Sequence, residues 1–254
     1  MRFYEWLTIV YFLFFMALAW LRALSMRRRL LITAAAAIGV TAIVGLQPTS
    51  VRDWLPLVFI PLAYFQTGEF VLPLNRTFQS MLESFDRGLV FGLPPRLMFL
   101  FELAYLFCYP LVPAGLAALY LSGQDRFAAE FWNVVLPPAY LCYATFPFVQ
   151  TLPPRAIEDR VPWQPERTRM RNVNLFVLRH VSIQANTFPS GHVAASVAVA
   201  LVLMSHTLWV GLVFMAIAVC IAAGAFFGRY HYGIDVIIGA VMAVMSWVFC
   251  RGGL

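Results

Sequence analysis

Long apolar runs recur along the whole chain, and polar residues gather mainly between them. A predominantly apolar run of about 20 residues is long enough to cross the hydrocarbon core of a bilayer as a helix. The pattern predicts an all-α, polytopic membrane bundle of about six to eight transmembrane helices. The eight candidate spans are residues 3–23, 30–47, 54–72, 96–121, 130–150, 190–206, 208–227 and 232–250. The third is the weakest, because Pro56, Pro61 and Pro73 interrupt it.

Two polar stretches interrupt this pattern. Residues 74–95 mix apolar and charged residues at helical spacing and end in two prolines, which predicts an amphipathic helix at the membrane interface. Residues 151–188 are expected to form a long polar loop. Loops of more than about 12–15 residues in compact domains are often functional, so we expect the active machinery to border this one. The loop carries six arginines, namely Arg155, Arg160, Arg167, Arg169, Arg171 and Arg179.

The composition agrees with a membrane protein. Of the 254 residues, 61% are hydrophobic and 12% are charged, against about 25% charged residues in soluble domains. The net charge is +6, and all 18 basic residues are arginines that lie between the spans and build no soluble basic domain. The expected partner is therefore the bilayer and not a nucleic acid. The four cysteines are scattered without a CxxC pair, which indicates neither a disulfide framework nor a zinc site.

The segment from Phe188 to His192 reads FPSGH and lies where the long loop meets an apolar run. Pro189 suits the start of a helix, and Ser190 can cap it. The first turn of a helix leaves backbone N–H groups unpaired, and together with the positive end of the helix dipole they bind anions. Gly191 lets a ligand approach the backbone closely. The segment can therefore bind an oxyanion and place the imidazole of His192 beside it.

His231 and Asp235 are four residues apart, which places them on one face if the chain is helical there. A carboxylate at that position can accept the proton of one ring nitrogen, and this raises the basicity of the other nitrogen. Such a pair suits a nucleophilic or general-base histidine. Taken alone, each motif also fits a capped helix or a satisfied His–Asp pair at the membrane interface. Together, and after an arginine-rich loop, the two motifs favour a functional site.

The stretches FPSGHVAAS and GRYHYGIDV resemble the second and third signature motifs of the type 2 phosphatidic acid phosphatase (PAP2) superfamily. That family's pattern is PSGH followed by Arg-x5-His-x3-Asp. The resemblance implies that His231 attacks phosphorus to form a phosphohistidine, with Asp235 orienting its ring. It further implies that His192 protonates the leaving alcohol, and that Ser190 and Gly191 hold phosphate oxygens. It implies no metal and no other cofactor.

The first family motif, Lys-x6-Arg-Pro, is absent, since the chain has no lysine. In its place, ATFPFVQTLPPRAIEDR is similar to a segment of the branch that includes the inositol phosphorylceramide synthases. ESFDRGLVFGLPP resembles the interfacial segment of the same branch. The resemblance covers about residues 53–239, and it makes Arg155 the expected phosphate-binding arginine.

The third motif also departs from the family pattern. The family's arginine would fall on Ala225, and the nearest arginine is Arg229, two residues before His231. Positions i and i+2 face different ways on a regular helix, so Arg229 can bind phosphate only if the chain is irregular there, which Gly228 allows. The alternative is an arginine that snorkels from a helix end.

The resemblance divides the chain into N-terminal transmembrane helices at residues 1–73 and a PAP2-like catalytic membrane domain at residues 74–254. The implied activity is a metal-independent lipid phosphate phosphatase that hydrolyses a phosphomonoester or diphosphate of a lipid, such as phosphatidate or polyprenyl phosphate. The alternative is a phosphotransferase that moves a phosphoryl headgroup to a lipid or polyol alcohol. No pattern in the sequence shows whether water or an alcohol receives the phosphoryl group, and none indicates an oligomeric state.

Two functions of other classes explain less. A proton-relaying transporter built on His231, Asp235 and Glu102 fits the rule that intramembrane ionisable residues are functional, but it leaves PSGH and the arginine loop unexplained. A serine hydrolase built on Ser190 lacks the strand–turn–helix nucleophile elbow. Glu102 itself either pairs with another helix or lines a substrate cleft. We expect His180 to be a solvated loop histidine and His206 to lie at the opposite interface.

The side of the membrane that the site faces depends on the arginines. With eight spans, 14 of the 18 arginines fall on the side of the motif-bearing helix ends. The positive-inside rule then places the site on the cytoplasmic face of the cell membrane. Seven of the 14, which are Arg229 and the loop arginines, also serve phosphate chemistry in this interpretation, and PAP2-type lipid phosphatases mostly work on the extracytoplasmic face. Weighing these two arguments, we expect by a slight margin that the site faces the cytoplasm.

Overall fold

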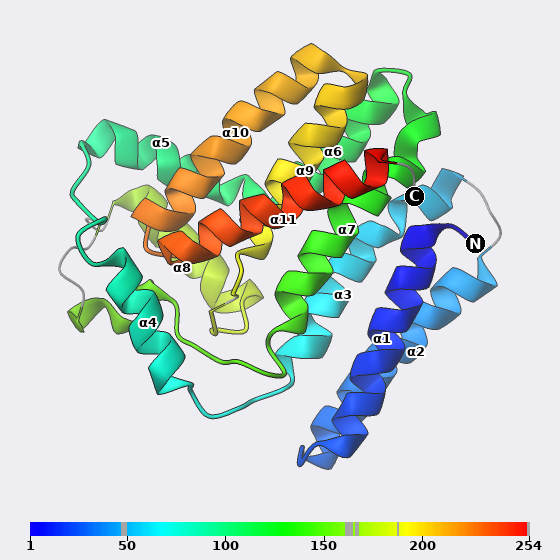
Figure 1. The fold of residues 1–254 in the computed structure, drawn as a ribbon, viewed down its shortest axis with the longest axis horizontal. Helices are drawn as coiled ribbons and strands as arrows, with labels where there is room; N and C mark the ends of the chain where they lie inside the picture. The colour runs from blue at the N-terminus through cyan, green and yellow to red at the C-terminus, as the bar shows by residue number, and fades with distance from the viewer. Residues whose placement is uncertain (47–49, 161–164, 166–167, 187, 253–254) are drawn as a thin grey trace.

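The computed structural model describes residues 1–46, 50–160, 165, 168–186 and 188–252. Within this part of the chain all regular elements are helical, which confirms the all-α class (Figure 1). Three short 3-10 helices, η1 (Ser50–Trp54), η2 (Asp125–Phe127) and η3 (Pro154–Arg160), lie in the connections. The α-helices are α1 (Phe3–Leu21), α2 (Met26–Gly45), α3 (Pro56–Gly68), α4 (Arg76–Asp86), α5 (Pro95–Leu106), α6 (Cys108–Leu121), α7 (Ala128–Ala144), α8 (Arg169–Val181), α9 (Gly191–His206), α10 (Leu208–Phe227) and α11 (Gly233–Arg251).

Each of the eight predicted spans contains helix, but not all are full spans. Among the described residues, α1, α2, α10 and α11 are long and apolar enough to cross a membrane. The helices α3, α7 and α9 are shorter, with 13, 17 and 16 residues. By length and composition, four of the described helices qualify as spans, or five if the pair α5–α6 counts as one span. This is fewer than the six to eight spans that the sequence predicts.

The predicted span at residues 96–121 is broken, because α5 and α6 meet at Phe107 with a bend of 62°. Pro110 explains the break. Proline has no N–H to donate to the carbonyl of Leu106, four residues earlier, and its ring crowds that carbonyl. The first helix therefore ends at Leu106, and the second begins at Cys108.

The N-terminal helices α1 and α2 lie side by side and pack against α3 and α7 (Figure 1). Their buried side chains belong to the same apolar cluster as those of α6, α7 and α9. Ion pairs between Arg2 and Asp53 and between Arg52 and Glu5 (2.6 Å) fasten one end of this assembly. The Trp132 indole N–H donates to the Asp53 carbonyl at 2.6 Å, which ties η1 to α7.

The two ends of α9 lie at opposite ends of the bundle. His192 is in its first turn, and His206 is its last residue. His206 Nε2 lies 3.0 Å from Glu130 Oε2, and its ring stacks on Phe127. At 1.5 Å per residue the two histidines are about 21 Å apart along the helix. His206 therefore lies away from the predicted site, as the sequence indicated.

The amphipathic helix predicted at residues 74–95 is present as α4, over only 11 residues. Asn75 caps it by accepting from the backbone N–H of Phe78 at 2.9 Å. Leu82 and Asp86, four residues apart, face the bundle, whereas Met81 and Phe85 are exposed.

The expectation that residues 151–188 form a loop is wrong in part, because this stretch holds η3 and the 13-residue helix α8. Thr168 caps α8 by accepting from the Arg171 backbone N–H at 3.2 Å. The buried face of α8 is Arg171, Asn174 and Leu178. These residues follow helical spacing, but two of the three are polar, so hydrophobic periodicity does not show the helix.

Candidate active site

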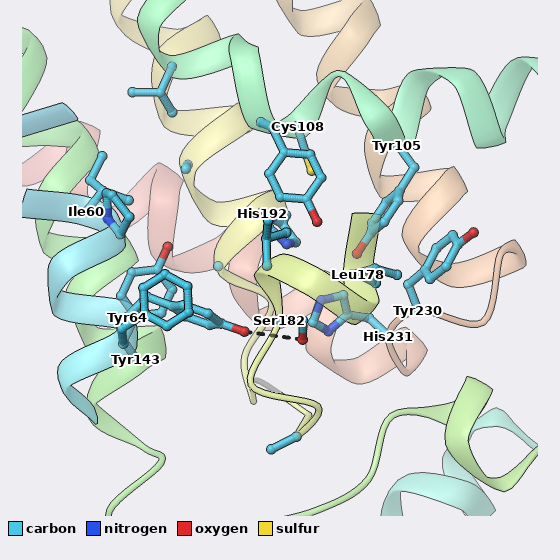
Figure 2. A pocket seen from close by; sticks show the side chains of 18 of the residues that line it. Ile60, Tyr64, Tyr105, Cys108, Tyr143, Leu178, Ser182, His192, Tyr230 and His231 are labelled. Carbon is cyan, nitrogen blue, oxygen red and sulfur yellow. Dashed lines mark hydrogen bonds between the residues drawn. The ribbon is translucent and has the colours of Figure 1, made fainter. Parts of the chain in front are cut away.

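A cavity of about 410 Å³ lies where α3, α6, α7, α8 and α9 come together (Figure 2). Its polar lining includes Arg155, His192 and His231. The rest is mainly aromatic and aliphatic, with Tyr64 and Tyr143 on one side of His192 and Tyr105 and Tyr230 on the other in this view. The lining also includes apolar side chains of α3 and α6, among them Leu57, Ile60, Phe65, Val112 and Pro113.

His231 lies just before α11 rather than on it, so the expected shared helical face is not what brings it to Asp235. The helix α10 ends at Phe227, and the backbone N–H groups of Tyr230 and His231 both donate to the Ala225 carbonyl, at 3.0 and 2.9 Å. Asp235 is in the first turn of α11, where its Oδ2 accepts from the Tyr232 N–H at 3.1 Å. One carboxylate oxygen thus caps the helix and contacts the ring.

The contact itself joins His231 Nδ1 and Asp235 Oδ2 at 3.4 Å. Asp235 is fully buried, and His231 is 5% exposed. Catalytic hydrogen bonds are often this long before substrate binds. Donation of Nδ1–H to the carboxylate leaves the lone pair on Nε2, so Nε2 is the atom available for attack.

Ser190 and Gly191 begin α9 as the sequence predicted. Ser190 is the N-cap, and its Oγ accepts a hydrogen bond from the Val193 backbone N–H at 3.5 Å. The Ser190 backbone N–H donates to the Asp235 carbonyl at 3.0 Å, which joins the two motifs directly. Gly191 lines the cavity, whereas the Ser190 side chain is fully buried and is not part of the lining.

Glycine is required at position 239 for this junction. A Cβ atom on Gly239 would lie 2.6 Å from the Ser190 carbonyl oxygen, closer than real Cβ contacts allow. The absence of a side chain lets the backbones of α9 and α11 approach where the two motifs meet.

His192 and His231 face each other across the cavity, with ring centroids 6.1 Å apart and ring planes at 76°. The Tyr105 and Tyr109 rings pack edge-on around His192, with centroids at 5.8 and 5.5 Å. The predicted pair of histidines is thus in one place, although they are 39 positions apart in the sequence (231 minus 192).

Arg155 also reaches this cavity. Its backbone N–H donates to the Arg229 carbonyl at 2.9 Å, and its Nη1 donates to the Tyr230 carbonyl at 3.4 Å. The segment after Pro153-Pro154 is therefore bonded to the segment that carries His231.

Arg229 is in the irregular conformation that phosphate binding would need, with a φ of 58°. Its side chain, however, is 2% exposed and is not among those that line the cavity. Nη1 donates to Asp86 Oδ2 at 2.7 Å. Burial raises the pKa of Asp86, while the Gly233 N–H and Arg229 act against that shift. The role of Arg229 as a phosphate ligand stays a prediction.

Glu102 pairs with another helix. Its carboxylate accepts from Arg171 Nη1 at 3.2 Å, from Asn174 Nδ2 at 2.6 Å and from the Tyr230 hydroxyl at 2.5 Å. Arg171 also donates to the Gly228 carbonyl at 2.7 Å. The sequence missed this buried network, because nothing local links residues about 70 and 130 positions apart.

The described polar candidates on α8 lie outside the cavity. Arg169, Arg179 and His180 are exposed on α8, and His180 Nδ1 bonds to the Phe176 carbonyl at 2.8 Å. The side chains of Arg160 and Arg167 lie outside the described residues. In the part of the chain that the structure describes, no group of three or more His, Cys, Asp or Glu side chains is placed to hold a metal ion.

A bundle of apolar helices with two facing histidines and an arginine in one cavity defines a membrane protein with a site suited to phosphoryl chemistry. Residues 79–249, more than half of the chain, match the sequence model of the PAP2 superfamily, and the chain belongs to this superfamily. Members of the superfamily are phosphatases or related phosphotransferases. No curated protein and no solved structure matches the chain. The family and the apolar helices are consistent with an integral membrane protein.

Proposed function

We propose that the protein is a lipid phosphate phosphatase of the cell membrane that works through a phosphohistidine on His231. The observation that carries the proposal is the cavity, in which His231, backed by Asp235, faces His192 at 6.1 Å with Arg155 in the same lining. Two imidazoles on opposite sides of one phosphorus atom can act as nucleophile and acid.

The first step forms a phosphohistidine. The Nε2 lone pair of His231 attacks phosphorus, the bond from phosphorus to the lipid oxygen breaks, and protonated His192 gives its proton to that oxygen. Asp235 stabilises the positive charge that grows on the His231 ring. Arg155 and the first-turn N–H groups of α9 offset the negative charge on the phosphate oxygens.

The second step releases phosphate. Neutral His192 takes a proton from water, and the water oxygen attacks phosphorus as the bond from phosphorus to Nε2 breaks. His192 is then protonated again, and His231 is free for another cycle.

The lining of the cavity favours an amphiphilic substrate. Beyond its polar end the walls are aromatic and aliphatic, from Tyr109 and Val112 on α6 and from Ile60 and Phe65 on α3. Burial of an apolar chain there contributes about 25 cal/mol per Å² of surface removed from water. A phosphorylated lipid can thus place its phosphate at the histidines and part of its chain against these side chains.

Transfer to an alcohol is the second candidate. It rests on the likeness of the chain's PPR and FDRGLVFG segments to the branch with the inositol phosphorylceramide synthases. Both segments contact Arg229 near the site, since Asp86 of FDRGLVFG accepts from Arg229 Nη1 and the Arg155 backbone N–H of PPR donates to the Arg229 carbonyl. This packing supports treating the two segments as one unit. An assay with and without an added alcohol as phosphoryl acceptor separates hydrolysis from transfer.

We expect orthovanadate, a mimic of pentacoordinate phosphorus, to inhibit turnover of labelled phosphatidate, and EDTA to leave it unchanged. In the same assay, free phosphate should appear without any added alcohol. Loss of activity with EDTA that a divalent ion restores would contradict the metal-free mechanism. Appearance of label only in a product of added polyol or lipid alcohol would replace hydrolysis by transfer.

The site is proposed to face the cytoplasm. Arg22 lies over the Phe148 ring at 6.0 Å and Arg28 is 3.9 Å from Glu69, so the arginine-rich turn between α1 and α2 is at the same end as the segment leading to Arg155. Among the described residues, the arginines at the opposite end are Arg2, Arg52, Arg126 and Arg251. This asymmetry is the basis of the positive-inside rule.

An Asn172→Cys variant in a cysteine-free background should test the side. Asn172 is exposed on α8, at the site end. In intact cells we expect a membrane-impermeant maleimide to label it only after permeabilisation. Ser122→Cys, exposed at the other end of the bundle, is the matched control and should react without permeabilisation. The reverse pattern would place the site on the extracytoplasmic face.

A further inference from the structure

One acidic side chain of α4 binds both ends of the segment that carries His231. Asp86 Oδ2 accepts from Arg229 Nη1 at 2.7 Å, and Asp86 Oδ1 accepts from the Gly233 backbone N–H at 2.8 Å. Arg229 and Gly233 lie two residues before and two residues after His231. Asp86 is 3% exposed, so these bonds do not compete with bulk water.

Gln79 lies on the same face of α4, two helical turns before Asp86. Its Nε2 lies 2.5 Å from the Tyr232 hydroxyl, and its Oε1 accepts from the Leu152 backbone N–H at 2.8 Å. The Tyr232 hydroxyl in turn donates to the Leu152 carbonyl at 3.0 Å. Tyr232 follows His231 directly, and Leu152 lies three residues before Arg155. Gln79 therefore joins the segment of the nucleophile to the segment of the phosphate-binding arginine.

The segment around His231 needs such support, because little regular structure holds it. Residues 228–232 lie between α10 and α11, and Arg229 has the left-handed backbone that side chains other than glycine adopt at a cost. Breaking a buried ion pair by removing one charge leaves the other without compensation. Loss of the Asp86 charge would therefore release the chain on the N-terminal side of His231 first.

We propose that Asp86 and Gln79 are positioning residues, through which α4 holds His231 and Arg155 in the geometry for attack on phosphorus. The inference rests on the proposed function, since it assigns α4 a part in the formation of the phosphohistidine. Neither side chain lines the cavity with the two histidines, so neither is a catalytic residue.

The test is the rate at which full-length purified protein in lipid nanodiscs becomes phosphorylated. The wild type and variants are mixed with ³²P-phosphatidate or ³²P-polyprenyl phosphate and quenched in alkaline detergent, which preserves phosphohistidine. The burst amplitude counts intact sites, and the rate constant reports the chemical step. Asp86→Asn keeps an acceptor for the Gly233 N–H and removes the charge that pairs with Arg229.

We expect Asp86→Asn to lower the rate constant about 100-fold, the loss that a misplacement of roughly 1 Å causes, with the burst amplitude preserved. Gln79→Leu should lower it about 10-fold by the same reasoning. Ser84→Ala is the matched control on the exposed side of α4, where the hydroxyl donates to the Met81 carbonyl of its own helix, and it should match the wild type.

Two results for Asp86→Asn would overturn the positioning role: a smaller amplitude with an unchanged rate constant, which marks a purely structural residue, or no change in either. If the wild type forms no phosphoenzyme with either lipid, the proposed function fails and this inference fails with it. A wild-type burst together with unaffected variants would instead reject the positioning role alone.

Discussion

The His231→Ala variant is expected to lower the rate of phosphate release by a factor of about 10⁴ or more, because it removes the atom that we propose attacks phosphorus. The fold should be nearly intact, since the backbone bond from the His231 N–H to the Ala225 carbonyl remains. Release of labelled phosphate by the purified variant measures the loss of activity, and its melting temperature reports whether the fold is intact. His180→Ala is the matched control, as His180 is exposed on α8 and lies outside the cavity.

The supporting carboxylate allows a graded comparison. Asp235→Asn should be severe but less so than His231→Ala, because the amide can still orient the ring but cannot stabilise its positive charge. If His231→Ala keeps a tenth of the wild-type rate, the phosphohistidine mechanism is wrong. If Asp235→Asn is as active as the wild type, Asp235 does not assist the nucleophile.

The largest effect on stability is expected from Arg171→Leu. Arg171 and Glu102 are each 1% exposed, so this change leaves the Glu102 carboxylate buried without its cation. Removing one partner of a buried ion pair costs about 3–5 kcal/mol. Denaturant unfolding of the purified protein in detergent measures the difference. The exposed neighbour Arg169→Leu should change the free energy of unfolding by no more than about 0.5 kcal/mol.

The double variant Arg171→Leu/Glu102→Leu checks the physical reason. Replacing a whole buried pair with apolar residues is often close to neutral. The double variant should therefore recover part of the lost stability, although the Tyr230 hydroxyl and Asn174 Nδ2 lose the Glu102 carboxylate that they donate to. Asn174 Nδ2 keeps its bond to the Glu102 backbone carbonyl at 2.7 Å. A double variant that is less stable than Arg171→Leu would show that Glu102 stabilises the fold without Arg171.

The features that could be predicted from the sequence are those that depend on the local pattern of residues, such as where helices lie and begin. The apolar runs predicted helices in all eight stretches, and Ser190 as a capping residue predicted the start of α9. The break at Phe107 follows from Pro110, but the apolar run continues through this position, so the alternation of apolar and polar stretches does not reveal the bend. The helix α8 was missed because Arg171 and Asn174 are polar residues on a buried face.

The partners of buried charges could not be predicted in the same way. Asp86 lies in a helix whose composition favours an interface, where a carboxylate normally faces water. Its bonds to Arg229 and Gly233 cross more than 140 residues of sequence. The one sign in the sequence was the position of Asp86 four residues after Leu82, which places both on the same face of α4.

The length of α9 has a consequence for where the reaction takes place. With His206 at the far end, the helix carries His192 at most about 21 Å across a hydrocarbon core of about 30 Å. The imidazoles would then lie several ångströms beneath the headgroup plane, and a lipid would have to sink, drawing its phosphate inward, before it could react. If the protein acts on lipid phosphates as proposed, a recess of this depth would exclude phosphates attached to bulky soluble groups, and the membrane itself would contribute to the selectivity of the reaction.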